Sequence, residues 1–112
     1  MKILTFATAA VTVLISMSSF AYAAGNAEKG KALFNDPKAF GGEKACSSCH
    51  PDGGGLESAA GKKAFNIAGR TQESLEEAVN ACIVYASGGK AIDVMSGQMK
   101  DIVAYIRSIG KK

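Results

Sequence analysis

The sequence predicts an all-α domain of three to four short helices. Three stretches repeat apolar residues with the spacing of a helix, and each begins next to a residue that commonly caps a helix. No stretch after the N-terminal segment alternates apolar and polar residues as a half-buried strand would. A long glycine-rich segment separates the first helical stretch from the second, so we expect the helices to enclose a functional loop.

The N-terminal segment has the three parts of a secretory signal. Lys2 is followed by an uncharged apolar run, ILTFATAAVTVLISMSSF, and then by the small-residue pattern Ala-Tyr-Ala at residues 21–23. We expect cleavage after Ala23, which makes residues 1–23 a signal peptide and residues 24–112 the mature domain. The alternative is a retained membrane anchor, because the apolar run is nearly long enough to span a bilayer.

The expected mature chain is small and nearly neutral, which limits the classes of function. It has 112 − 23 = 89 residues, enough for one domain whose core is marginal without a cofactor or cross-links. Without Lys2 the formal charge falls from +3 to 3 − 1 = +2, and no basic run is interleaved with aromatic residues. We therefore exclude nucleic acid as a partner. The chain has three cysteines, which cannot all pair with one another, so we expect a prosthetic group instead of a disulfide framework.

The first helix is predicted over residues 26–35. Asn26 is a good N-cap, Glu28 lies in the first turn, and Pro37 ends the helical pattern. From residue 36 to residue 70 the chain has many glycines and no sustained periodicity. A loop of this length in a small domain is expected to serve the function.

The second helix is predicted over residues 71–87, with Thr71 as its N-cap, and the third helix from Ser96 to Gly110. The helical spacing places Cys82 on the buried face of the second helix. The residues predicted on the two buried faces are Leu75, Ala78, Val79, Cys82, Ile83 and Ala86 in the second helix, and Met99, Ile102, Val103, Ile106 and Ile109 in the third.

One motif in the glycine-rich segment indicates the chemistry. Cys46, Cys49 and His50 form a C-x-x-C-H sequence. Such a motif attaches haem covalently, contributes to a zinc site, or acts as a thioredoxin-like redox pair. Zinc would need Cys82 as a fourth ligand and would use the consecutive Cys49 and His50, which is an uncommon spacing. A thioredoxin-like pair needs a βαβ unit, which the sequence does not predict.

Covalent haem meets every constraint that the sequence sets. Two thiols at this spacing add to the two vinyl groups of one porphyrin, and the adjacent histidine then lies under the iron as an axial ligand. A haem also buries a large apolar face and so supplies core that a domain of this size lacks. We therefore predict one haem c, bound through Cys46 and Cys49, with His50 as the proximal iron ligand.

Three segments resemble the class I cytochromes c, which are small all-helical monohaem electron carriers. They are AEKGKALFN at residues 27–35, CSSCH at residues 46–50 and MKDIVAYIRSIG at residues 99–110. The resemblance covers nearly the whole mature chain and implies the small cytochrome c fold around one covalent haem. It also implies that the first and last helices cross at Gly30, which lacks a side chain.

The class I resemblance leaves the distal iron ligand open. Members of that class usually supply a methionine from a Met-Pro loop before the last helix, and the corresponding SGGKAIDVM segment contains no Met-Pro. His50 is the sole histidine, so a second histidine from the same chain is excluded. The remaining candidates are Cys82, Met95, Met99 and a lysine such as Lys90.

A narrower resemblance favours Cys82. The segment LEEAVNACIVYASGGKAIDVMSGQMKDIVAYIRSI, residues 75–109, is similar to the haem domains of thiosulfate dehydrogenases and related sulfur-oxidation cytochromes. In that group the cysteine of a V-N-x-C element ligates the iron of the catalytic haem, and this element matches residues 79–82. The resemblance therefore implies Cys82 as the distal ligand. Met95 is the next candidate, and Met99 is interpreted as a core residue because it shares the helical register of its neighbours.

Two functions of different class are compatible with these observations. We expect a periplasmic one-electron carrier between redox partner proteins, monomeric or in weak complexes, with no stable membrane insertion after signal cleavage. The alternative is a haem subunit or enzyme of thiosulfate oxidation with His/Cys-ligated iron. The enzymes of that group commonly carry two haems and an arginine after the cysteine, whereas this chain has one C-x-x-C-H, and Val84 and Tyr85 replace the arginine.

Overall fold

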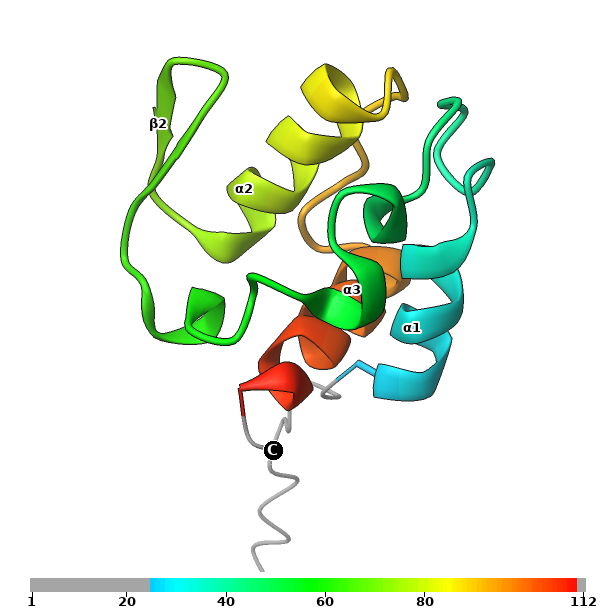
Figure 1. Cartoon of the computed structure of the whole chain (residues 1–112), viewed down its shortest axis with the longest axis horizontal. Helices are drawn as coiled ribbons and strands as arrows, with labels where there is room; N and C mark the ends of the chain where they lie inside the picture. The colour runs from blue at the N-terminus through cyan, green and yellow to red at the C-terminus, as the bar shows by residue number, and fades with distance from the viewer. Residues whose placement is uncertain (1–24, 111–112) are drawn as a thin grey trace, which may run out of the picture.

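The computed structural model describes residues 25–110, so the expected signal peptide over residues 1–23 lies outside the described range. The elements follow in the order α1 (Ala27–Asn35), η1 (Cys46–Ser48), η2 (Pro51–Gly53), η3 (Ala59–Gly61), β1 (Phe65–Ile67), β2 (Arg70–Gln72), α2 (Leu75–Ala81), η4 (Cys82–Ala86) and α3 (Gly97–Ile109). The first three η elements are single 3-10 turns, and η4 is a π-helical turn that continues α2. In Figure 1, α1 lies against α3, while α2 and the strands lie on the other side of the molecule. No helix in the described range is long and apolar enough to cross a bilayer.

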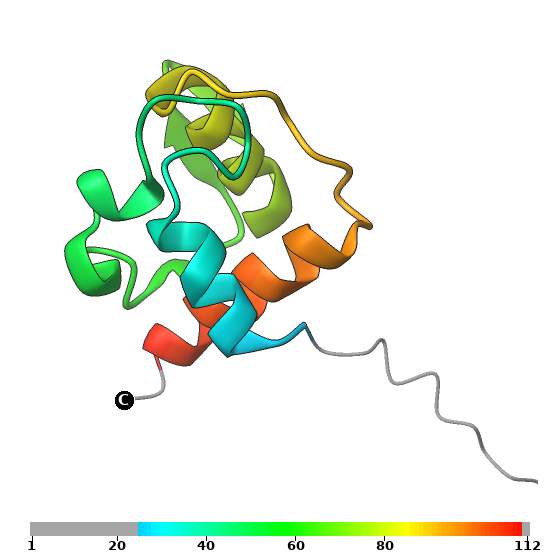
Figure 2. The same cartoon turned by 90° about the vertical axis from the view of Figure 1, so that its right-hand side faces the viewer.

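The helices α1 and α3 cross where α1 has no side chain. A Cβ on Gly30 would meet the carbonyl of Asp101 and the Cβ of Tyr105, so the two backbones approach as closely as glycine permits. One turn further along α1, the rings of Phe34 and Tyr105 pack edge to face with centroids 5.1 Å apart and planes at 64°. Figure 2 shows the crossing from the side. The crossing that the class I resemblance implies is therefore present.

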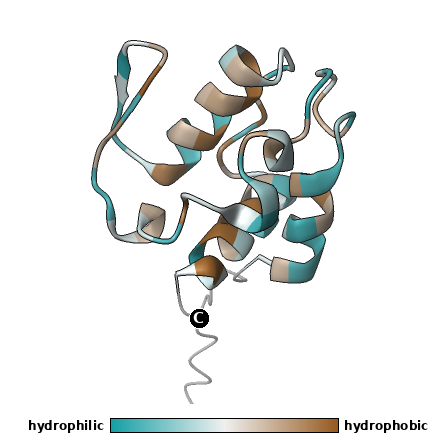
Figure 3. Cartoon of the chain, in the orientation of Figure 1, coloured by the Kyte–Doolittle hydropathy of each residue, from teal (hydrophilic) through white to brown (hydrophobic). Residues whose placement is uncertain are grey.

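The apolar side of α3 forms the centre of the core. Ser96 caps the helix by accepting a hydrogen bond from the Met99 N–H at 3.2 Å, as the predicted start requires. Hydrophobic residues gather on α2 and along the middle of α3 (Figure 3). The core cluster consists of Phe34, Ala59, Val79, Ile83, Met99, Ile102, Val103, Tyr105, Ile106 and Ile109.

The fold is mostly helical, but it contains one antiparallel hairpin that corrects the all-α prediction. Strands β1 and β2 pair with Asn66 opposite Thr71, and the two residues between the strands are Ala68 and Gly69. Their φ angles of 54° and 73° are both positive, as a type I′ turn requires. Each strand has three residues, too few to show an alternating pattern, and alanine is an unusual residue at the first turn position. These features explain why the sequence pattern does not reveal the hairpin.

The second helix starts later than predicted because Ser74, and not Thr71, is its N-cap. The Ser74 Oγ accepts a hydrogen bond from the Glu77 N–H at 3.1 Å, and the Glu77 carboxylate accepts one from the Glu73 N–H at 2.9 Å. This reciprocal arrangement satisfies two N–H groups at the helix start. Thr71 is instead part of β2.

Candidate functional site

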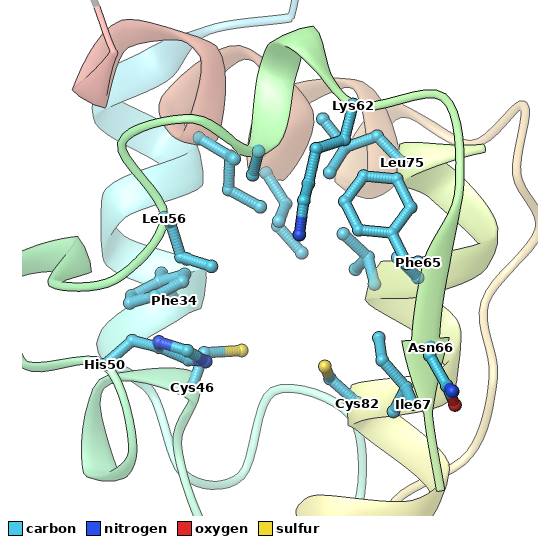
Figure 4. A pocket seen from close by; sticks show the side chains of 15 residues that line it. Phe34, Cys46, His50, Leu56, Lys62, Phe65, Asn66, Ile67, Leu75 and Cys82 are labelled. Atoms are coloured by element: carbon cyan, nitrogen blue, oxygen red, sulfur yellow. The ribbon is translucent and has the colours of Figure 1, made fainter. Parts of the chain in front are cut away.

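One pocket lies between α2, α3 and the glycine-rich segment (Figure 4). Its volume is about 240 Å³. Most of its wall is apolar and comes from Phe34, Leu56, Ala59, Phe65, Ile67, Leu75, Ala78, Val79, Ile102 and Ile106. The remaining wall residues are Cys46, His50, Lys62, Asn66 and Cys82. Two thiols and an imidazole are therefore gathered around one apolar space.

The C-x-x-C-H motif folds into one tight turn. The N–H groups of Cys49 and His50 both donate to the Cys46 carbonyl, at 3.2 and 3.0 Å. Residues four apart on such a turn lie on the same side of it. Cys46 and His50 line the pocket, whereas Cys49 is exposed and does not line it. The turn thus presents one thiol and the imidazole to the pocket and leaves the second thiol close by.

A backbone carbonyl orients His50. The Nδ1 atom lies 2.9 Å from the carbonyl oxygen of Gly54. A carbonyl only accepts, so Nδ1 donates its hydrogen, and the lone pair of the neutral ring is left on Nε2. The turn that carries Gly54 is held against α3 at Gly53, where φ is 75° and a Cβ would meet the side chain of Ile109. Histidines that ligate metals are commonly oriented in this way, so His50 is set to offer Nε2 to a metal in the pocket.

Cys82 lies on the wall across the pocket from Cys46 and His50 (Figure 4). Burial raises the pKa of the Cys82 thiol above its ordinary value, and the nearby Cys49 adds to the rise. Burial is also the main cause that raises the pKa of Cys46, with a smaller contribution from Cys82. These two thiols are therefore protonated at neutral pH, until bonding to carbon or to a metal replaces the proton.

The π-helical turn η4 begins at Cys82 and changes the direction of the side chains that follow. The N–H of Ser87 donates to the Cys82 carbonyl, five residues back, at 3.0 Å. Ile83 is fully buried, whereas Ala86, which the α-helical spacing predicts on the buried face, is exposed. The wider turn therefore moves Ala86 off the face that Cys82 and Ile83 share. Such turns inside α-helices occur frequently at functional sites.

Asn80 fixes the path of the chain between η4 and α3. Its Nδ2 donates to the Ile92 carbonyl at 2.8 Å, and its Oδ1 accepts from the Ile92 N–H at 2.9 Å. One side chain thus satisfies both backbone groups of one residue in a segment without helix or strand. Asn80 belongs to the V-N-x-C element, and it precedes Cys82 by two residues.

Two backbone hydrogen bonds join the segment before the C-x-x-C-H motif to the segment after η4. The N–H of Glu43 donates to the Ser87 carbonyl, and the N–H of Lys90 donates to the Phe40 carbonyl, both at 2.9 Å. The approach requires glycine at Gly42, where a Cβ would meet the Ser87 carbonyl. The two segments that carry the pocket cysteines are thereby tied to each other.

The other candidates for the distal ligand lie outside the pocket wall. Met95 is 58% exposed, and Met99 is fully buried in the core. Lys90 is exposed, and none of these three lines the pocket. Of the four candidates that the sequence offers, Cys82 is the one on the wall opposite His50.

The arrangement fits haem c better than zinc. Among residues 25–110, no three histidine, cysteine, aspartate or glutamate side chains are grouped so that they could hold a metal ion, so the tetrahedral set considered from the sequence is not formed. Haem needs a flat apolar space, thiols at its edge and an axial ligand on one or both faces. The pocket offers apolar walls, Cys46 beside His50, and Cys82 across from them.

Three features of the site are not identified from the sequence. They are the Gly54 carbonyl that orients His50, the two hydrogen bonds of Asn80, and the position of Lys62 on the pocket wall. Gly54 and Lys62 lie in a segment without periodicity, so no pattern indicates where they point. One indication in the sequence that Asn80 matters to the site is its position two residues before Cys82 in the V-N-x-C element.

A family model described as "SoxA/TsdA, cytochrome c domain" matches residues 29–112. The matched range contains all of α1 except its first two residues, every later element, the C-x-x-C-H motif and every residue that lines the pocket. Neither a curated protein nor a solved structure gave a match to the chain.

Proposed function

Since the chain belongs to the SoxA/TsdA cytochrome c domain family and is therefore a haem-containing cytochrome of the sulfur-oxidation type, we propose that it carries single electrons between redox partner proteins. The carrier has one haem c and acts in the periplasm after export, as a monomer or in weak complexes with its partners. The haem iron supplies the one-electron couple, and the chain binds, orients and shields it.

Four residues hold the haem in this proposal. Cys46 and Cys49 form the two thioether bonds, each by adding its S–H across one vinyl group. His50 is the proximal ligand through Nε2, supported by its hydrogen bond to the Gly54 carbonyl. Cys82 is the distal ligand, supported by its place on the opposite wall.

The composition of the pocket wall is the observation that carries the choice of a carrier. The wall is apolar around Cys82, and Lys62 is the one charged residue other than the potential ligands. Apolar surroundings suit a haem whose iron changes its oxidation state without binding a substrate, because they exclude water from the iron. An anionic sulfur substrate would need several cationic or hydrogen-bonding groups beside the reacting position.

A second candidate function is a haem subunit in the oxidation of thiosulfate. The family match and the position of Cys82 favour it, because a thiolate at the iron is the feature that the V-N-x-C resemblance associates with the catalytic haem. In such a subunit the chain would act with a second haem protein, since it contains one C-x-x-C-H.

Reduction by thiosulfate separates the two functions. The purified ferric protein is mixed with thiosulfate, alone and with a second c-type cytochrome, and the visible bands of each haem are followed. A carrier exchanges electrons with the second cytochrome and is not reduced by thiosulfate under either condition. Thiosulfate-dependent reduction that is lost in Cys82→Ala would refute the carrier and establish the enzyme subunit.

Electron paramagnetic resonance of the ferric protein tests the distal ligand. We expect the signal of the wild type to change in Cys82→Ala and to stay the same in Met95→Ala, whose side chain is 58% exposed and outside the pocket wall. A thiolate also stabilises ferric iron, so the reduction potential should rise when Cys82 is replaced. A signal that is unchanged in Cys82→Ala and lost in Met95→Ala would assign the methionine instead.

A further inference from the structure

Lys62 is the one lysine or arginine on the pocket wall. It follows η3 directly, and its N–H donates to the Ala59 carbonyl at 3.2 Å, which fixes where its side chain begins. The Nζ lies 5.8 Å from the ring centroid of Phe65. Figure 4 shows the side chain extending into the pocket from the side away from Cys46, with its ammonium group toward the central space.

The ammonium group has an aromatic neighbour but no acidic one. Within residues 25–110, Lys62 forms no ion pair with a carboxylate, and the wall around it consists of apolar side chains such as Leu56 and Leu75. Lys62 is an exposed residue that also lines the pocket, so it lies at the rim of the pocket and is not cut off from water. An aromatic ring at this distance attracts an ammonium group only weakly at an exposed site. A side chain at the rim of the pocket is free to point into solvent, so its inward direction fits an anion inside the pocket.

The anionic groups of haem are its two propionates, and both lie at the same edge of the porphyrin ring. The two vinyl groups and the two propionates lie at opposite edges of the porphyrin ring. Thioether bonds to Cys46 and Cys49 would hold the vinyl edge beside η1, and the propionate edge would then face the other side of the pocket. Lys62 lies on that side (Figure 4).

We propose that Lys62 forms an ion pair with a haem propionate and holds the anionic edge of the ring at the mouth of the pocket. The inference rests on the proposed haem attachment. The pairing offsets negative charge close to the iron, which favours the ferrous state and raises the reduction potential. It also fixes the edge of the ring that the thioether bonds leave free.

Three variants of the holoprotein test the proposal. Lys62→Gln removes the charge, and Lys62→Arg keeps it. Lys63→Gln removes a charge from the next residue, which is exposed and does not line the pocket. The measurements are resonance Raman spectra in the region of the propionate bending bands, and reduction potentials at one pH and one ionic strength. A residue with a merely structural role would not move the propionate bands.

We expect Lys62→Gln to shift a propionate band and to lower the potential. Lys62→Arg should resemble the wild type, and Lys63→Gln should leave the bands in place and change the potential less. Equal spectra and potentials for Lys62→Gln and Lys63→Gln would overturn the proposal. A change in the bands of the iron ligands in Lys62→Gln would also overturn it, because it would place the amine at the iron.

The result distinguishes this inference from the proposed haem attachment. If the wild type carries no haem, there is no haem spectrum and the proposed function fails. If the haem is present and the propionate bands do not respond to Lys62→Gln, the ion pair alone is wrong.

Discussion

Replacing Asn80 with alanine should lower the stability of the holoprotein and leave its iron ligands unchanged. The substitution removes both hydrogen bonds to Ile92 and leaves the N–H and the carbonyl of that residue without a side-chain partner. Asn80 and Ile92 are both half-buried, so water replaces the lost partners only in part.

The size of the effect can be worked out from these two bonds. A hydrogen bond contributes about 1 kcal/mol net to the free energy of unfolding, so the pair contributes about 2 kcal/mol. In a domain of 60–100 residues, each kcal/mol changes the melting temperature by about 4–8 °C. Asn80→Ala should therefore lower the melting temperature by about 8–16 °C.

The assay is thermal unfolding of the holoprotein, followed by far-ultraviolet circular dichroism and by the visible haem bands. Gln98→Ala is the matched control, because Gln98 is an exposed amide on α3 whose side chain forms no hydrogen bond within residues 25–110. We expect this control to melt close to the wild type, and the haem bands at low temperature to be the same in all three proteins. A melting temperature of Asn80→Ala within about 3 °C of the wild type would refute the reasoning.

The remaining predictions concern attachment, packing and export. Cys46→Ala should greatly reduce the yield of holoprotein, and acid-acetone should extract no haem from the wild type; extraction of the haem would show that it is not covalently bound. Gly30→Ala should lower the free energy of unfolding by about 1–3 kcal/mol, because a Cβ would meet α3, while Gly97→Ala, which has open space around it, should not; equal denaturant midpoints would contradict the close crossing. Met99→Ala should cost about 2–5 kcal/mol in urea unfolding and leave the ferric spectrum unchanged, and a changed spectrum would place Met99 at the iron. The intact mass of the secreted protein should correspond to a chain that begins at Ala24 and carries one covalent haem, and a mass that also includes the leader would indicate a retained anchor.

The helices could be predicted from the sequence wherever their caps and their buried faces agree. Asn26 and Ser96 cap α1 and α3 as expected, and the glycine at the crossing is present. The start of α2 could not be decided, because Thr71 and Ser74 are both acceptable caps and only tertiary structure places Thr71 in a strand. The hairpin was missed because three-residue strands carry no readable period.

The residues of the site, like the helices, could be predicted only where a local pattern indicates them. Spacing along the chain is sufficient to bring Cys46 and His50 to one side of a turn, and helical phase is sufficient to point Cys82 toward the pocket. The directions of side chains and carbonyls in the glycine-rich segment could not be predicted, because they depend on contacts with α3 and not on neighbours in the chain. Gly53, next to the Gly54 carbonyl, contacts Ile109 of α3, and Lys62 follows η3, which packs against α3; no local pattern indicates either position.

The π-helical turn at η4 has a consequence for comparing this chain with its relatives. A π turn accommodates one more residue than an α-helical turn over the same rise, so η4 is equivalent to a single-residue insertion after Cys82. A relative whose helix continues with regular α geometry would have one residue fewer between the counterparts of Cys82 and Gly88. Alignments across the family should therefore keep the cysteine in register and place a one-residue gap after it, because a gap placed before it would pair Cys82 with a residue that faces another direction.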